Sequence, residues 1–197
     1  QNGRPATQTQ EATPGQHAVS TMIRPVDSAT DLSSGGTVGD EWSLVLTNTY
    51  PSVDVEKSIA GGWTLDPNSS VLHPEATDFE VTYTTTNSGG FPLTEFTIKD
   101  PSLAGRTLTR EGKPDYVVPD DGTIDPAFCD LGSGTSLAAG AAATCTFRAS
   151  IAEAPPTLVK VDGGPVTVSA TAGTGPTAQH VSDKDSFSTM RPVVGTL

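Results

Sequence analysis

The chain has 197 residues and a formal net charge of −12, with 23 acidic against 11 basic side chains. Because it has few Lys and Arg residues and no basic run, we expect neither a nucleic-acid partner nor binding to an anionic membrane surface. No stretch approaches the roughly 18 apolar residues of a membrane-spanning helix, so membrane insertion is not expected either. The chain opens at Gln1 rather than Met, and only 17% of its residues are charged. Both features favour a processed, secreted protein or an excised fragment.

The N-terminal quarter of the sequence differs from the rest. Residues 1–16 are polar and rich in Gln, Thr, Pro and Gly, which predicts a flexible segment. Residues 17–50 contain about two strand patterns, too few to close a core. We therefore expect a partial β domain or strands exchanged with a neighbour at 17–50, followed by a complete domain at 52–197.

Short runs of alternating apolar and polar residues lie between turns rich in Gly, Pro, Asp and Asn, which is typical of half-buried strands. Regularly spaced runs of this kind predict an all-β protein, an Ig-like antiparallel β-sandwich with one buried and one solvated face per sheet. In chain order the runs lie at 42–47, 53–59, 79–84, 95–98, 145–151 and 166–170.

One short motif occurs twice. The segment from Val19 to Val26 resembles the segment from Phe187 to Val193, with one residue inserted, and each copy contains one of the two methionines. We interpret it as the same strand used at the start and at the end of the chain. A tandem array, or a subunit that exchanges strands with its neighbour, would show this pattern.

The two cysteines, Cys129 and Cys145, flank a turn-rich stretch that can reverse the chain, and we expect them to form a disulfide. The alternative is two unrelated buried thiols. No Cys or His cluster has zinc-site spacing, so neither a metal nor a cofactor is expected. The acidic segments 120–125 and 183–185 offer carboxylates for Ca²⁺, but the first lacks the spacing of an EF-hand loop, so solvated turns are favoured.

Sequence signs of catalysis are lacking. His17, His73 and His180 are scattered, with no HExxH motif, no Gly-x-Ser-x-Gly elbow and no phosphate-binding Gly-rich loop. We therefore expect a protein that is not an enzyme.

Lys57 is the unusual residue of the strand patterns. It falls on the apolar side of its run, because residues two apart in a strand share a face. A buried, unpaired ammonium is unfavourable, so this lysine must extend to solvent, pair with an acid or lose its charge. Asn87 and Asp100, at the ends of later runs, are candidate partners on inward phases.

Several of these motifs together resemble a tandem repeat of unknown function on bacterial, actinobacterial-type surface proteins. The resemblance rests on the run from Val53 to Ser58, on the run from Phe79 to Asp100 and on the segment from Ser136 to Phe147, where Ala139 replaces a usual Pro. Upstream, the segment from Leu46 to Tyr50 is similar to the final strand of collagen-adhesin B-type (CnaB) domains. Both families imply Ig-like sandwiches joined into stalks, adhesins or pili on the bacterial cell surface.

The collagen-adhesin resemblance also implies a specific chemistry. In such domains an inward lysine forms an isopeptide bond to Asn or Asp, assisted by a nearby carboxylic acid. For Lys57 the acceptors are then Asn87 or Asp100, or Asp183 and Asp185, which lie where the families' C-terminal acceptor would fall. The alternatives are an ordinary salt bridge of Lys57 and a lysine at a sandwich edge.

The function expected from these features is an extracellular structural or adhesive stalk module. Its partners would be neighbouring domains, or further copies joined by β-strand addition. One alternative is a pilus-like filament subunit assembled by strand complementation through its N-terminal region. The other is a carbohydrate-binding module for a host or surface glycan, whose binding face could be lined by Trp42, Trp63, Tyr50 and Tyr116. Of the two tryptophans, Trp63, after Gly61 and Gly62, is the candidate exposed aromatic, whereas Trp42 has a core phase.

Overall fold

The computed structural model describes residues 6–8, 21–23, 50–155, 157–161 and 164–193. The chain divides into two compact units, Gln1–Tyr50 and Pro51–Leu197. The described strands of the first unit are β1 (Ala6–Gln8) and β2 (Thr21–Ile23), which pair antiparallel. Apart from these strands and Tyr50, the predicted segments 1–16 and 17–50 lie outside the described residues.

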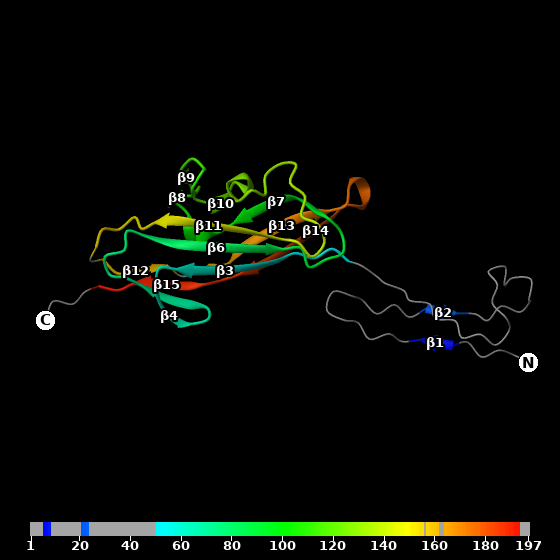
Figure 1. Ribbon diagram of the computed structural model, residues 1–197, viewed down its shortest axis with the longest axis horizontal. Coiled ribbons are helices and arrows are strands. Elements are labelled where there is room, and N and C mark those ends of the chain that lie inside the picture. Colours follow the sequence, from blue (N-terminus) through cyan, green and yellow to red (C-terminus); the bar gives the residue numbers. More distant parts are fainter. Residues whose placement is uncertain (1–5, 9–20, 24–49, 156, 162–163, 194–197) are drawn as a thin grey trace, which may run out of the picture. The chain divides into compact units, whose positions relative to one another are not determined.

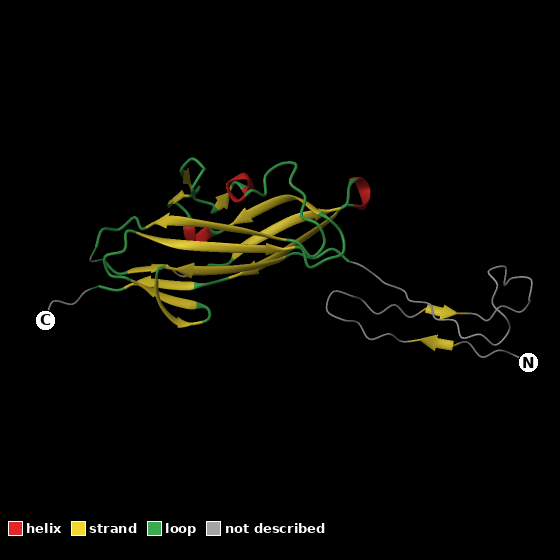
Figure 2. Ribbon diagram, in the orientation of Figure 1, coloured by secondary structure: helices red, strands yellow, loops and turns green. Residues whose placement is uncertain are grey.

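The second unit is an all-β, sandwich-like fold built mainly from antiparallel sheets, as the alternating pattern predicts (Figure 2). Its described helices are three short 3₁₀ turns, η2 (Pro101–Leu103), η3 (Pro126–Cys129) and η4 (Gly175–Thr177). None of the helices in the described part of the chain has the length and apolar character needed to cross a bilayer.

A five-stranded antiparallel sheet carries the first strand of this unit at its edge. Lys57 in the edge strand lies opposite Tyr83, and Tyr83 in turn lies opposite Cys145, so these three side chains share a face. The strands, in spatial order, are β3 (Asp54–Ala60), β6 (Asp78–Thr86), β11 (Ala142–Ser150), β8 (Thr107–Thr109) and β9 (Tyr116–Val117).

A four-stranded sheet forms the opposite layer. The register between β7 and β13 shifts between Ser169 and Thr171, and Glu95 in β7 has φ of 52°, so a β-bulge interrupts this ladder. The strands, in spatial order, are β10 (Thr123–Ile124), β7 (Leu93–Lys99), β13 (Val166–Ala172) and β14 (Gln179–Asp185).

A third sheet contains the last described strand of the unit. Its strands, in spatial order, are β12 (Val159–Val161), β15 (Ser188–Arg191), β5 (Ser69–Leu72) and β4 (Gly62–Asp66). β15 and β5 run parallel, which the expectation of purely antiparallel sheets did not include. Parallel neighbours require a long connection, and here most of the sandwich lies between the two strands in the sequence.

Strict alternation places the core. β3 and β6 bury every second side chain, including Val55, Ile59, Phe79 and Val81, and one continuous apolar cluster fills the sandwich. Within this unit, the segment that leads into β3 and the segment that follows β15 lie at opposite ends of the sandwich (Figure 1).

Candidate functional site

The most distinctive polar group of the core is an ion pair between Lys57 and Asp100. β3 carries Lys57 inward, and Asp100 follows β7 as the N-cap of η2. The Lys57 Nζ lies 2.6 Å from Asp100 Oδ2, and both side chains are 0% exposed. Because β3 and β7 belong to different sheets, the pair connects the two layers across the core.

Asp100 accepts hydrogen bonds from four donors. Oδ2 accepts from Lys57 Nζ and from the Tyr83 hydroxyl, each at 2.6 Å. Oδ1 accepts from the backbone N–H of Ser102 at 3.0 Å and from its hydroxyl at 2.5 Å. Both oxygens of this carboxyl group therefore act as acceptors, each for two hydrogen bonds.

The ammonium of Lys57 is equally well supplied with acceptors. Besides Asp100, it donates to the hydroxyl oxygen of Ser102 at 3.2 Å and to the carbonyl of Gly164 at 3.4 Å. Three acceptors match the three protons of an ammonium. The cluster therefore provides hydrogen-bond partners for both members of the buried ion pair, Lys57 and Asp100.

Tyr83 is the neutral member of the cluster. Burial, the charge of Asp100 and the hydrogen bond to Asp100 together raise the pKa of Tyr83 well above its usual value of 10.0. The phenol stays protonated and acts as a donor to the carboxylate.

A glycine fits the backbone beside Asp100. The carbonyl of Gly122 accepts from the Asp100 N–H at 2.8 Å, and Gly122 has φ of +77°. A Cβ at this position would lie 2.6 Å from Pro101 Cα, so only glycine allows this close approach.

Asp183 and Asp185 hold the outer edge of β3 rather than its lysine ammonium. Asp183 Oδ2 accepts from the backbone N–H of Val55 at 2.9 Å, and Asp185 Oδ2 accepts from that of Lys57 at 2.7 Å. Both carboxylates come from β14 at the edge of the opposite sheet, and their two-residue spacing matches the spacing of outward N–H groups in a strand. They connect two edges that no backbone ladder joins.

Asn87 lies outside the cluster and fastens a loop. Its amide nitrogen donates to the carbonyls of Phe91 and Leu137, each at 2.8 Å, and its Oδ1 accepts from the Gly89 N–H. Of the four predicted acceptors, the structure therefore brings Asp100 to the Lys57 ammonium. The structure shows this contact as a salt bridge, one of the alternatives named above, and the isopeptide bond stays a hypothesis that intact mass tests.

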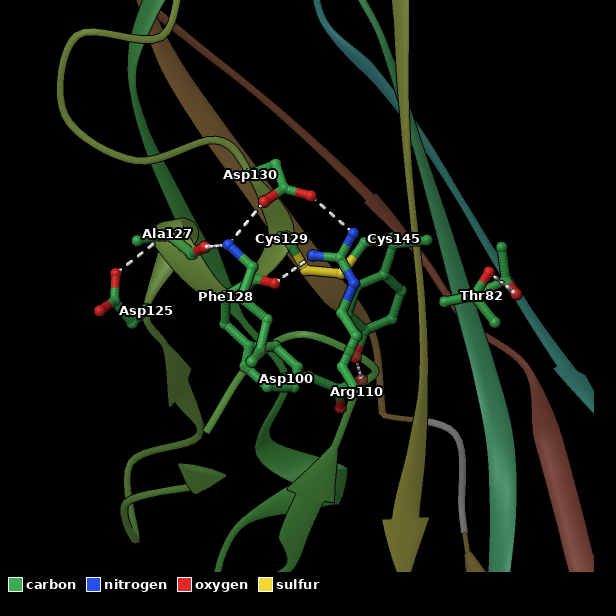
Figure 3. Close-up of a disulfide and its surroundings, with 12 residues drawn as sticks. Thr82, Asp100, Arg110, Asp125, Ala127, Phe128, Cys129, Asp130 and Cys145 are labelled. Atoms are coloured by element: carbon green, nitrogen blue, oxygen red, sulfur yellow. Dashed lines mark hydrogen bonds and ion pairs between the residues drawn. A yellow bond between two sulfur atoms is a disulfide. The ribbon is translucent and has the colours of Figure 1, made fainter. Parts of the chain in front are cut away.

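Cys129 and Cys145 form a disulfide that joins η3 to β11 (Figure 3). Next to it, Asp130 pairs with Arg110 and Lys113, each at 2.6 Å, and these hydrogen bonds lower the pKa of Asp130. Arg110 also donates to the carbonyl of Phe128. The disulfide loop is thus fixed by both covalent and ionic contacts.

The acidic turn and the described histidines make local contacts. Asp121 accepts from the N–H and hydroxyl of Thr123, which lowers the pKa of its carboxyl, and Asp125 caps η3 by accepting from Ala127. His180 bonds to the Thr171 hydroxyl. In the described ranges no group of three or more His, Cys, Asp or Glu side chains is arranged to hold a metal ion. His17 and Trp42 lie outside those ranges.

Trp63 is 56% exposed on β4, and the edge of its ring contacts His73, with ring centroids 4.9 Å apart. The interplanar angle of 66° means that the two rings do not form a flat platform.

Sequence reasoning missed part of the polar core. It placed Tyr83 inward but not its hydroxyl on Asp100, and it did not find Ser102 or Gly164. It also missed Arg191, which is fully buried and donates to the carbonyls of Ala76, Glu153 and Thr157. Among the described residues its Nε has no hydrogen-bond partner. The sequence signal that could have identified this arginine is alternation, because Thr189 and Arg191 fall on the inward side of the last strand.

Comparison with known proteins adds no relative. No family model matches the chain, and no curated protein matches it significantly. The resemblance to tandem surface repeats therefore stays a prediction from the motifs.

Proposed function

We propose that the Pro51–Leu197 unit is a load-bearing structural module of an extracellular stalk, and that it is not an enzyme. The observation that carries this proposal is the placement of its ends. The chain enters before β3 at one end of the sandwich and leaves after β15 at the other, as a module in a linear stalk requires (Figure 1).

The first strand is also held on three sides. β3 pairs with β6 along its whole length, and two of its backbone N–H groups donate to Asp183 and Asp185 of β14. The ion pair between Lys57 and Asp100 connects it across the core. β3 lies along the long axis of the sandwich (Figure 1), so a pull between the two ends loads these contacts in shear. In shear the bonds must break together, whereas peeling would break them one at a time.

The disulfide and the sequence motifs bear on the location of the module. A buried disulfide is compatible with an oxidising, extracellular compartment. The bacterial surface is implied by the motif resemblance alone, and it belongs to the proposal.

Single-molecule force spectroscopy tests the mechanical role. The full chain is placed between reference domains and pulled from its two ends. We expect a distinct unfolding peak for the unit and a lower peak force in Lys57→Met, because the tie between layers is lost.

Lys99→Met is the matched control, since Lys99 lies in β7 with its side chain 54% exposed, and it should leave the force unchanged. Extension of the wild-type unit without a resolvable force peak would overturn the load-bearing role.

The alternatives stay predictions. Strand complementation concerns residues 17–50, most of which lie outside the described ranges. The exposed ring of Trp63 favours glycan binding, but the inclined ring of His73 does not extend it into a coplanar surface.

A further inference from the structure

The outward face of the third sheet gathers exposed apolar side chains. Six large hydrophobic residues of the described part are exposed, and three of them lie on the outward phase of this sheet. These three are Trp63 in β4 at 56%, Met190 in β15 at 39% and Leu158, directly before β12, at 58%. A concentration of this kind on one small face indicates a contact surface rather than scattered exposure.

The strand register arranges part of this face into a row. Trp63 of β4 lies opposite Val71 of β5, Val71 beside Met190 of β15, and Met190 opposite Lys160 of β12. Directly paired residues share a face, so the row crosses all four strands over about 14 Å. Ser70, on the next position of β5, points inward and bonds to Thr189, which confirms that the row faces out.

The order of residue types in the row is complementary to itself. It runs from an aromatic ring, through two aliphatic side chains, to an exposed lysine. A two-fold axis between Val71 and Met190 would reverse the order on a second copy. The lysine of each copy would then face the tryptophan of the other, a favourable cation–π arrangement, and the aliphatic residues would face one another.

We propose that this row is a self-association surface, on which a second copy of the chain packs face to face through a two-fold axis. Trp63 of each copy contacts Lys160 of the other, and Val71 contacts Met190. This goes beyond the load-bearing role, because it concerns modules lying side by side rather than end to end.

The expected strength follows from the size of the face. Four short strands offer less area than the roughly 800 Å² per partner of a stable complex, so a single pair of modules should associate weakly. Stalks with several such modules would adhere more strongly, because each later contact forms at a high effective concentration.

Sedimentation velocity on the full chain, from micromolar to millimolar concentration, tests the association. We expect a concentration-dependent dimer whose association constant falls about tenfold or more in Trp63→Ala and in Met190→Ala. Phe91→Ala and Val117→Ala are the matched controls, since both residues are exposed apolar side chains away from this sheet, and they should leave it unchanged.

Cross-linking tests the two-fold register. Both native cysteines are in the disulfide, so a Trp63→Cys chain and a Lys160→Cys chain each carry one reactive thiol. A short bismaleimide should link the mixture of the two chains but neither chain alone. The mixed pair keeps one intact tryptophan–lysine contact, so association is retained.

A wild-type chain that stays monomeric throughout overturns the proposal, as does equal cross-linking within each single variant. A monomer that binds a glycan array through Trp63 also overturns it and favours the carbohydrate-binding alternative. The force measurement on the same chain does not depend on self-association, so failure of this proposal and failure of the proposed mechanical role are distinguishable.

Discussion

At the scale of single residues, Lys57 depends on its acceptors. Removing two charges from water is unfavourable, and the attraction between them compensates only when every proton and lone pair is engaged. Lys57 and Asp100 meet this condition through Tyr83, Ser102 and Gly164. The pair is therefore far more sensitive to loss of one partner than to loss of both.

Lys57→Met tests this dependence. It leaves the Asp100 carboxylate buried beside an apolar side chain, and we expect the free energy of unfolding to fall by about 3–5 kcal/mol in urea titrations. The double variant Lys57→Met, Asp100→Leu should be less destabilised than the single variant. A loss no larger than that of the exposed control Lys99→Met would contradict the role of the pair.

Tyr83 predicts a pH dependence at alkaline pH. Its pKa is raised in the folded state, so its contribution to stability is complete below the unfolded value of 10.0 and is lost as pH rises toward the folded value. Tyr83→Phe should therefore flatten the decline of the urea midpoint that sets in above about pH 10, where the phenol ionises in the unfolded chain but not in the folded one.

Tyr116→Phe is the control for this profile, since the Tyr116 hydroxyl donates to the exposed carbonyl of Thr123 and contacts no carboxylate there. Identical profiles for wild type and Tyr83→Phe would show that the phenol does not titrate with folding.

At the scale of elements, the edges of β3 and β14 are joined by side chains. An open strand edge can pair with a strand of another chain through its free backbone N–H groups. Carboxylates that accept from these N–H groups occupy the positions that the carbonyls of such a strand would take. Asp183 and Asp185 provide this cover for Val55 and Lys57.

Replacing both aspartates by alanine should expose the edge of β3. We expect faster hydrogen exchange at the amides of Val55 and Lys57, measured by NMR at constant pH, because their acceptors are gone. Asp54→Ala with Glu56→Ala removes two exposed carboxylates from the same strand and is the control. Unchanged exchange in the β14 variant would mean that the backbone of β3 is protected by other contacts.

Local patterns in the sequence predicted the sheets well. The period of two placed Lys57 and Tyr83 inward, because a strand in a two-layer fold must bury one face. The short stretch between Cys129 and Cys145 was enough to suggest their disulfide.

The same patterns could not identify long-range neighbours. Alternation predicts which face of a strand a residue lies on, but not which residues of other strands it contacts. The sequence therefore left four candidate acceptors for Lys57. Asn87 has an inward phase, yet its amide nitrogen donates to two backbone carbonyls, those of Phe91 in its own loop and of the distant Leu137. The parallel pairing of β5 with β15 depends on a connection through most of the sandwich, which no local signal encodes.

At the scale of the whole molecule, intact mass distinguishes an ion pair from a covalent cross-link. We expect the mass of the sequence less two hydrogens for the disulfide, apart from any cyclisation of Gln1. The reason is that the structure shows Lys57 and Asp100 as a salt bridge, in which Asp100 accepts four hydrogen bonds and Lys57 Nζ donates three.

Loss of one further water in the wild type that is absent in Lys57→Met would instead indicate an amide between Lys57 and an aspartate. Asp100→Asn is the informative companion, since an amide acceptor would release ammonia rather than water.

The disulfide sets how far the module can extend after it unfolds. When an unfolded chain is pulled at its ends, each residue adds to its extended length. The segment between Cys129 and Cys145, with a sequence separation of 16, adds nothing, because the disulfide closes it into a loop. At the reach of an extended chain this withholds roughly 55 Å. The contour length released on unfolding should therefore increase by that amount under reducing conditions, which makes the extended length of the unfolded unit depend on the redox state of its surroundings.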